Sequence, residues 1–400
     1  MAVKDHREIG QELDLFSFSD KTPGFVYWHP KGTLLFDLMV SDIKKRLAKF
    51  DYQEIKTPAV MNVATLKETG HYDNYREKLF FIGHQDEMEN PKWALKPMNC
   101  PGSIVIFKDK MRSYKEMPLR FSEIGTVYRY EQAGEIGGLL RVRALTIDDA
   151  HIYCRENQIE EEIVSLIDFV YETYQRYGFS KVKIELSTRP EKSIGTDEQW
   201  QRAEAGLANA LKKKNLEYKE NPGEGAFYGP KIDFHIEDSQ NRSWQLGTIQ
   251  LDFALPPRMG INYIDEKGAK QSPIIIHRAI LGSVERFLAV FLEHTQGSLP
   301  LWLAPVQIAI LPISEKSFDY AKKIKKEITG SGYRTEVDTV NETIGKKIRS
   351  WELQKTPYIL VVGEDEEKTG QVAVRSHQKG DQGKIDIKEF INQIKNELEG

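Results

Sequence analysis

The chain has 400 residues, of which 40% are hydrophobic and 29% charged, and its net charge is −4. Four hundred residues exceed the size at which one core usually keeps growing, so we expect two domains of a globular protein. No apolar run reaches the roughly 18 residues of a membrane helix, and the first residues resemble neither a signal nor a transit peptide. The net charge neither favours nor excludes a nucleic-acid partner. Two cysteines, Cys100 and Cys154, give no disulfide framework, which indicates the reducing cytoplasm.

The first three hundred residues predict clustered hairpin strands with helices between them, as in an antiparallel α+β core. A helix over residues 33–49 leads into a strand that Pro58 ends. Residues 60–92 read mostly as loop, and Cys100 falls in a turn between two prolines. The later elements are two strands joined by a glycine-containing loop between Val127 and Cys154, a helix near 157–177, the strand KVKIELS, a helix capped by Thr196, the strand WQLGTIQLDF, and the strand PIIIHRAILGS with a helix capped by Ser283.

From about Val306 the pattern changes to strands alternating with helices. The strands VQIAIL, YRTEVD, YILVVG and QVAVR are interleaved with helices near 316–330, 343–354 and 387–398. This alternation is typical of a compact α/β domain with a largely parallel sheet. Two architectures therefore predict two domains, residues 1–298 and 299–400.

The hairpin between Val127 and Cys154 carries charged groups at inward positions. Alternation along a strand places Arg129 and Glu131 on one face, and it does the same for Asp149 and His151 on the second strand. Burying such groups is costly unless a charged ligand or a metal meets them. The hairpin is therefore our first candidate site.

The same alternation bears on metal binding. Cys154 lies an odd number of residues from His151 and should point to the opposite face, so Cys100 is the better sulfur if His151 binds a metal. One cysteine and two histidines from separate elements, with His277 as the second, would leave zinc an open position. The chain has no compact CxxC or HExxH cluster, and purely structural roles for Cys100 and His277 stay open at this point.

Three arginines suit an anionic ligand such as a polyphosphate, because guanidinium groups bind phosphate oxygens in pairs. They are Arg129, Arg141 and Arg286, and the last lies in the first turn of a predicted helix. The alternative is that each pairs with a carboxylate, such as Glu131 or Glu285. Since neither a P-loop nor a GxGxxG motif occurs, a bound nucleotide would have to be held by an antiparallel sheet and arginines.

A series of motifs lies in order along the chain. The helix and strand ending at Pro58, the hairpin opening with YRYEQ and the unit holding GSVERF resemble the three signature motifs of class II aminoacyl-tRNA synthetases. The segments KPMNCPG, GHYDNY, RVRALTIDDAHIY, STRPEKSIG, EGAFYGPKIDF, GTIQLDF, IIIHRAILGSVERF and WLAPVQ resemble the threonyl-tRNA synthetase family within that class. The resemblance implies an antiparallel α+β class II catalytic domain over residues 1–298 and a small α/β anticodon-binding domain over residues 299–400.

The resemblance also implies a role for each matching residue. Cys100, His151 and His277 match the zinc ligands of the family, where the metal holds the amino and hydroxyl groups of threonine. On the amino acid side, Asp149 matches the carboxylate that accepts from the threonine hydroxyl, and Tyr228 matches a residue beside the amino group. On the nucleotide side, Arg129 matches the arginine on the ATP α-phosphate and the amino acid carboxylate, Glu131 a residue on the adenine side, Arg141 and Arg286 residues on the polyphosphate, and Gln245 and Gln250 residues around the ribose and adenylate.

The remaining matches concern tRNA. His71 matches the histidine that assists proton movement at the terminal ribose of tRNA, and Asn341, Glu366 and Arg375 match anticodon-reading positions.

The implied activity is the ATP-dependent ligation of L-threonine to tRNA(Thr) through threonyl-adenylate. The implied cofactors are one Zn²⁺ per chain and Mg²⁺ with ATP, and the implied assembly is a cytoplasmic homodimer with no membrane partner. The alternatives are a synthetase-like paralogue that binds tRNA or threonine without ligating, and a zinc hydrolase. The arginines favour the ligase, since a binding module needs no ATP contacts and a hydrolase leaves the arginines unexplained.

Several positions depart from the family pattern. The segment KDHREIG, which resembles the start of the catalytic region, begins within the first few residues, so we expect a fragment or a short form without the N-terminal domain that corrects seryl-tRNA. Ile147 stands where some relatives have glutamine, Ser103 replaces a histidine, and Ala144–Leu145 replaces a Gly-Phe pair. Val340 occupies a position that is usually arginine in the anticodon-binding domain.

Overall fold

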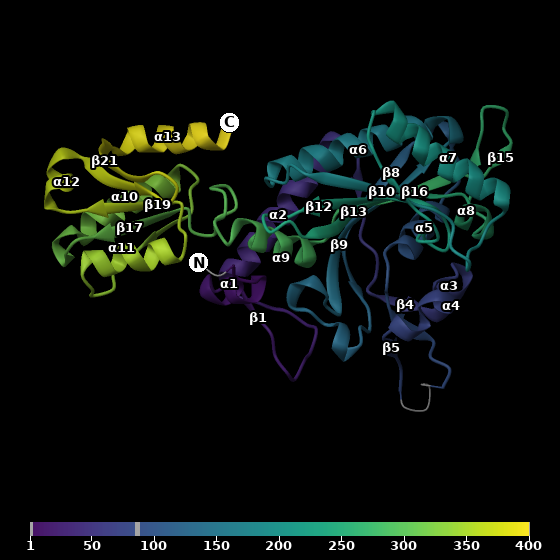
Figure 1. The fold of residues 1–400 in the computed structure, drawn as a ribbon, viewed down its shortest axis with the longest axis horizontal. Coiled ribbons are helices and arrows are strands. Elements are labelled where there is room, and N and C mark those ends of the chain that lie inside the picture. Colours follow the sequence, from purple (N-terminus) through teal and green to yellow (C-terminus); the bar gives the residue numbers. More distant parts are fainter. Residues whose placement is uncertain (1–2, 85–88, 400) are drawn as a thin grey trace. The chain divides into compact units, whose positions relative to one another are not determined.

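The structure is a computed structural model that describes residues 3–84 and 89–399. Contacts divide the chain into two compact units (Figure 1). The core unit contains residues 18–26 and 40–291, and the C-terminal unit contains residues 292–400 together with residues up to 17 and 27–39. In the described ranges we find no helix that is long and apolar enough to cross a membrane. The predicted boundary at residue 298 stays a prediction.

The core unit is built on an eight-stranded sheet. Its six inner strands run antiparallel to one another, and a short strand pairs in parallel at each edge, which confirms the predicted antiparallel architecture. In spatial order the strands are β11 (Lys219–Asn221), β10 (Val182–Ser187), β12 (Lys231–Glu237), β13 (Ser243–Asp252), β16 (Ile274–Ser283), β9 (Ala144–Cys154), β8 (Leu119–Tyr128) and β3 (Gln53–Glu54).

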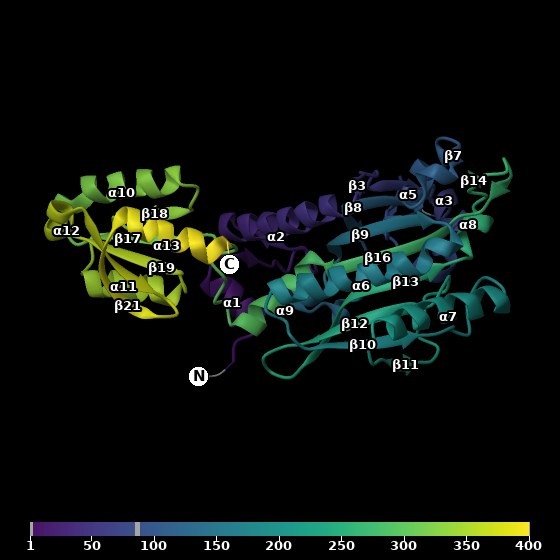
Figure 2. The same cartoon turned by 90° about the horizontal axis from the view of Figure 1, so that it is seen from above.

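Two long helices, α6 (Ile159–Arg176) and α7 (Asp197–Lys213), cover one face of this sheet across β12, β13 and β16 (Figure 2). Both were predicted, and Thr196 caps α7 as expected, because its hydroxyl oxygen accepts from the Gln199 N–H at 3.2 Å. Further helices are α1 (His6–Glu12), α2 (Pro30–Lys49), α5 (Cys100–Lys108), α8 (Leu255–Arg258) and α9 (Val284–Thr295). Further short strands are β1 (Phe16–Ser17), β2 (Tyr27–Trp28), β7 (Arg112–Ser113), β14 (Tyr263–Ile264) and β15 (Lys270–Gln271).

The described part of residues 60–92 is regular, so the expectation of a mostly irregular segment is wrong there. It holds two helices and two strands of a small sheet that β6 completes. Each element is too short for its hydrophobic period to stand out in the sequence. Residues 85–88 lie outside the described residues. The elements are β4 (Val60–Asn62), α3 (Val63–Glu68), α4 (His71–Tyr75), β5 (Phe81–Ile82) and β6 (Trp93–Leu95).

A tyrosine hydroxyl bridges β13 and β16 where their ladder ends. Regular pairing stops at Thr248 opposite Ala279. Beyond that point the Tyr174 hydroxyl, which comes from α6, donates to the Ile280 carbonyl at 3.0 Å and accepts from the Gly247 N–H at 2.7 Å. The hydroxyl therefore satisfies two buried backbone groups that the sheet leaves unpaired.

A bulge in β16 ends the strand and starts α9. The β16–β9 register shifts between Ala279 and Ser283. Gly282 has φ +72°, and a Cβ on it would lie 2.6 Å from the Leu246 carbonyl oxygen, so only glycine fits there. Asp148 of β9 fills the bulge, where its carboxylate accepts from the N–H groups of Ile280, Leu281 and Gly282 at 3.0–3.2 Å.

The C-terminal unit has a five-stranded mixed sheet. The second strand in spatial order is parallel to both of its neighbours, but the last two strands pair antiparallel, so the prediction of a largely parallel sheet holds for three strands. In spatial order the strands are β18 (Thr335–Val337), β17 (Ile308–Pro312), β19 (Tyr358–Val362), β20 (Gln371–Ser376) and β21 (Gly380–Asp386), and the helices are α10 (Phe318–Gly330), α11 (Ile344–Leu353), α12 (Glu364–Thr369) and α13 (Ile387–Glu399).

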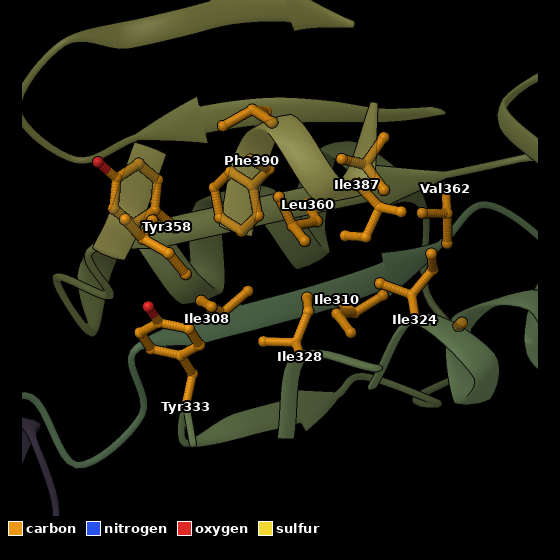
Figure 3. Close-up of a cluster of buried hydrophobic side chains, with 14 of the residues drawn as sticks. Ile308, Ile310, Ile324, Ile328, Tyr333, Tyr358, Leu360, Val362, Ile387 and Phe390 are labelled. Carbon is orange, nitrogen blue, oxygen red and sulfur yellow. The ribbon is translucent and has the colours of Figure 1, made fainter. Parts of the chain in front are cut away.

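Alternate residues of β17 pack on opposite faces of that sheet. Ile308 and Ile310 join Phe390 of α13 in one buried cluster (Figure 3), whereas Leu311 joins Trp351 of α11 in another. Helices therefore cover both faces, as expected for an α/β domain.

We predict that Tyr174→Phe lowers the free energy of unfolding by about 1–3 kcal/mol, because two buried backbone groups lose their partner. Chemical denaturation of the purified protein measures the change. Tyr171→Phe is the matched control, since Tyr171 lies on the same helix and makes no hydrogen bond to another described residue. Equal effects of the two substitutions would contradict the bridging role.

Candidate active site

Three potential metal ligands converge in the core unit. Cys100 is the first residue of α5, His151 lies on β9, and His277 lies directly opposite His151 on β16. Their ligand atoms lie within 4.8 Å of one another, and all three residues are buried. Within residues 3–84 and 89–399, no other group of three or more histidine, cysteine or carboxylate residues converges in this way. The structure thus brings together the three residues that the family resemblance indicated.

The helix α5 explains how Cys100 reaches this position. The sequence indicated a turn, but Cys100 opens a helix, and Pro101 is tolerated because a helix leaves its first N–H groups unpaired. Cys154, by contrast, is fully buried opposite Ile274 in the sheet and is not part of the ligand group.

The donor set fits zinc. Burial raises the pKa of the Cys100 thiol and lowers the pKa of His151, so a cation is what would stabilise the thiolate here. His277 Nε2 lies 3.0 Å from Asp252 Oδ2, and the other oxygen of Asp252 accepts from two N–H groups at the start of α8. A carboxylate that fixes a histidine ring in this way is usual around bound metals.

His71 lies against the ligand group. Its Nε2 is 3.3 Å from Cys100 Sγ, and its Nδ1 is 2.8 Å from Thr69 Oγ1. Burial, together with the charges of His277 and Arg129, lowers the pKa of His71 to about 3. The imidazole is therefore neutral at physiological pH.

Three more of the predicted residues surround the ligand group. Asp149 shares the β9 strand with His151, and its Oδ2 accepts from Asn99 Nδ2 at 2.7 Å. The ring of Tyr228 lies 4.9 Å from the ring of His277 and its hydroxyl donates to Gln250 Oε1. Gln250 is also the β13 partner of His277. The structure thus gathers a carboxylate, a phenol and an amide beside the ligand group.

Arg129 and Glu131 lie just beyond the end of β8. The alternation argument does not apply to them, because β8 ends at Tyr128 and the Glu131 N–H turns back to the Arg129 carbonyl at 2.8 Å. Arg129 Nε donates to the Pro97 carbonyl at 3.2 Å, and Glu131 pairs with Lys78 at 2.6 Å.

The alternative of simple arginine–carboxylate pairs fails for Arg286. Glu285 accepts instead from the Thr146 N–H and the Ser283 hydroxyl, and Glu131 pairs with a lysine. The Nε of Arg286 is buried and forms no hydrogen bond with any residue in the described ranges. Burial, and then the charge of Arg141, lowers the pKa of Arg286. An anion would supply the missing partner.

The residues that the resemblance predicts on the nucleotide side differ in their local contacts. Ser283 caps α9 as predicted, since its hydroxyl accepts from the Arg286 N–H at 3.1 Å. Arg141 is exposed and lies 3.5 Å from Glu135. Gln245 donates to Asp233 Oδ1 at 2.5 Å, which holds the amide against β12.

The three predicted anticodon residues lie apart in the C-terminal unit. Asn341 is exposed just before α11, and Glu366 is buried at the start of α12, where it pairs with Lys384 at 2.6 Å. Arg375 of β20 lies 3.2 Å from Glu352 near the end of α11. No hydrogen bond or ion pair within the described ranges joins the three.

The structure shows the neighbours or the exposure of three residues that depart from the family pattern. The Ser103 hydroxyl forms a 2.9 Å hydrogen bond with the Tyr153 hydroxyl. Ile147 lies opposite Gly125 in the β8–β9 ladder, and Val340 is 63% exposed.

A buried ion pair that sequence reasoning missed lies beneath Asp149. Glu123 is directly opposite Asp149 in the β8–β9 ladder and pairs with Lys96 at 2.8 Å, with both side chains at most 5% exposed. The Thr57 N–H and hydroxyl also donate to Glu123, at 2.9 and 3.0 Å. The alternation of β8 signalled that Glu123 faces inward, but nothing in the sequence indicated its partners.

Comparisons with known proteins agree with this geometry. Residues 82–295 match the tRNA synthetase class II core domain (G, H, P, S and T), and residues 307–397 match an anticodon binding domain. The threonine–tRNA ligase of Clostridium botulinum (strain Langeland) is 47% identical over 395 residues. The chain belongs to the threonyl-tRNA synthetase family.

Other members of the threonyl-tRNA synthetase family are equally similar. The threonine–tRNA ligase of Caldanaerobacter subterraneus subsp. tengcongensis is 48% identical. Each of these two matches covers 99% of this chain but 61% of the relative, so the chain spans about three fifths of the length of its curated relatives. The solved RNA binding domain of threonyl-tRNA synthetase from Cryptosporidium parvum Iowa II has a TM-score of 0.93 and 40% identity, and the match covers 98% of both chains.

We predict that Lys96→Met lowers the free energy of unfolding by about 3–5 kcal/mol, because it leaves the buried Glu123 carboxylate without its cation. Thermal or urea unfolding measures the loss. The double variant Lys96→Met/Glu123→Gln should recover part of it, since no unpaired charge remains. Lys181→Met removes one member of an exposed pair with Glu237 and should cost less than about 1 kcal/mol. A loss at Lys96 no larger than that at Lys181 would refute the ion-pair assignment.

Proposed function

We propose that this chain ligates L-threonine to tRNA(Thr) with ATP, through a threonyl-adenylate intermediate. The observation that carries the proposal is the convergence of Cys100, His151 and His277 beside Asp149. Arg286, whose Nε is buried without a hydrogen-bond partner among the described residues, supports an anionic second substrate. Family membership supports the same activity.

The ligand group serves selection of the amino acid. Cys100, His151 and His277 would hold Zn²⁺, which would supply a Lewis acid for the amino and hydroxyl groups of threonine. Asp149 accepts from the hydroxyl, and Tyr228 lies beside the amino group. Valine leaves Asp149 without its donor, and such losses give discrimination of about 10⁴ or more, whereas serine loses only a methyl group, roughly 1–3 kcal/mol.

Adenylate formation needs alignment more than proton transfer. The carboxylate of threonine is already ionised, so its attack on the α-phosphate requires compensation of charge, which Arg129 supplies together with the Mg²⁺ that accompanies ATP. Arg141 and Arg286 bind the polyphosphate, and Glu131 lies on the adenine side. Gln245 and Gln250 contact the ribose and the adenylate.

Transfer to tRNA requires a ribose hydroxyl to lose a proton. His71 is our candidate for assisting this loss, because it matches the family position for that role and lies against the ligand group, with its Nε2 3.3 Å from Cys100 Sγ. Asn341, Glu366 and Arg375 read the anticodon. We further propose that the protein acts in the cytoplasm as a homodimer, through the helix and strand that end at Pro58.

The alternative is a paralogue of the synthetases that binds tRNA or threonine without ligating. Arg286 argues against it, since its Nε has no partner among the described residues and a binding module has no need of a polyphosphate site. The two functions differ in a simple observable, the threonine-dependent exchange of pyrophosphate into ATP.

We expect exchange with threonine, weaker exchange with serine and almost none with valine. Arg129→Ala should lower the threonine rate by about 10²–10³-fold, the usual effect of removing one donor that stabilises developing charge. Arg202→Ala is the control, because Arg202 lies on the outside of α7 beside Glu156. Absence of threonine-dependent exchange at saturating ATP would rule out the ligase and favour the alternative.

Metal analysis tests the ligand group. We expect about one zinc ion per chain in the wild-type protein, and Cys100→Ala should lose both the zinc and the exchange activity. Cys154→Ala should keep both, since Cys154 is buried in the sheet away from the group. Zinc retained by Cys100→Ala and lost from Cys154→Ala would reverse the assignment of the two cysteines.

A further inference from the structure

The side chain of Asn99 does not form the hydrogen bond that is usual at its position. Asn99 is the N-cap residue of α5, where asparagine normally accepts a hydrogen bond from the first turn of the helix. Here the side chain makes no capping bond. Its Nδ2 instead donates to Asp149 Oδ2 at 2.7 Å, and the residue is fully buried.

The amide is oriented at a cost to stability. Turning it over would place Oδ1 against the Asp149 carboxylate, so the nitrogen must face the acid. Oδ1 is then buried without a hydrogen-bond partner among the described residues. A buried polar atom left unpaired destabilises the folded state, and native proteins rarely keep one without a functional reason.

Gly125 makes room for this arrangement. A Cβ on Gly125 would lie 2.5 Å from Asn99 Oδ1, closer than real Cβ contacts. The residue is inside β8, where glycine weakens a strand and often marks a close approach. The missing side chain therefore lets the amide reach Asp149.

The neighbouring carboxylate does not compete for the amide. Glu123 is the cross-strand partner of Asp149, but it already accepts from Lys96 and from Thr57. Among the side chains in the described ranges, only that of Asn99 forms a hydrogen bond with the Asp149 carboxylate. One oxygen of Asp149 is thus fixed by Asn99, which leaves the other free to accept from a ligand.

We propose that Asn99 is a positioning residue that sets specificity for the amino acid hydroxyl. By holding Oδ2, it fixes the rotation of the Asp149 carboxylate so that Oδ1 meets the hydroxyl of threonine. The inference rests on the proposed function for the identity of the substrate. It predicts that losing the amide weakens recognition of threonine but leaves valine, which has no hydroxyl, unaffected.

The test compares threonine with valine in two assays on the full chain. Calorimetry measures the Kd for each amino acid, and pyrophosphate exchange measures kcat and KM. For Asn99→Ala we expect the preference for threonine over valine to fall about 10- to 100-fold, mainly through the Kd and KM for threonine, with the KM for ATP unchanged.

Three further variants separate positioning from a structural role. Asn99→Asp has the same shape but places a second carboxylate against Asp149, so it should lower the preference at least as much as Asn99→Ala. Gly125→Ala displaces the amide and should act in the same direction. Ser103→Ala, on the same helix with a hydrogen bond to Tyr153 instead, is the control and should leave the preference unchanged.

The outcomes distinguish this inference from the proposed function. Threonine binding without exchange by the wild type would overturn the ligase, and the calorimetric preference would still decide the role of Asn99. A preference kept within about twofold in Asn99→Ala and Asn99→Asp would overturn the inference. So would equal losses for threonine and valine accompanied by a lower Tm, since these indicate a structural role, and so would absence of threonine binding by the wild type.

Discussion

The register between β9 and β16, which sets His151 opposite His277, is the constraint on which the site depends. Strand side chains alternate between faces, so a slip of one residue would carry every inward group of β9 to the other side of the sheet. Asp148 illustrates how the register is pinned, because its carboxylate accepts three N–H groups from the bulge in β16. The two adjacent aspartates therefore have different roles, since Asp148 holds the sheet together and Asp149 faces the ligand group.

The bulge also explains how one sheet presents two kinds of chemistry. Before the bulge, His277 of β16 lies beside His151 and Cys100. After the bulge, the chain turns into α9, and Arg286 lies in the first turn of that helix. Tyr174 and Gly282 make the transition possible, since one bridges the backbone groups that the ladder leaves unpaired and the other occupies a conformation closed to other residues. The residues proposed for the amino acid and those proposed for the nucleotide thus lie on consecutive stretches of one strand–helix unit.

Much of the fold and part of the candidate site could be predicted from the sequence. The features that could not be predicted have physical reasons. The long helices, the inner strands and the facing of His151 follow from hydrophobic period and alternation, which act locally. Alternation favoured Cys100 over Cys154 as a partner of His151, but only the resemblance assigned Cys100, His151 and His277 as one ligand group, because Cys100 and His277 lie far from His151 along the chain. Alternation did not extend to Glu131, since β8 ends earlier, and the role of Asn99 was hidden because its side chain leaves the helix it caps for a partner fifty residues away.

The two faces of β9 have a consequence for changing what the site accepts. Since alternate residues of the strand are committed to the fold, insertions or deletions in β9 would exchange the two sets and damage both. New substrate preferences in this scaffold should therefore arise by replacing side chains at fixed backbone positions. Ile147 is the natural place for such replacements, because it lies two residues before Asp149 on the inward-facing set.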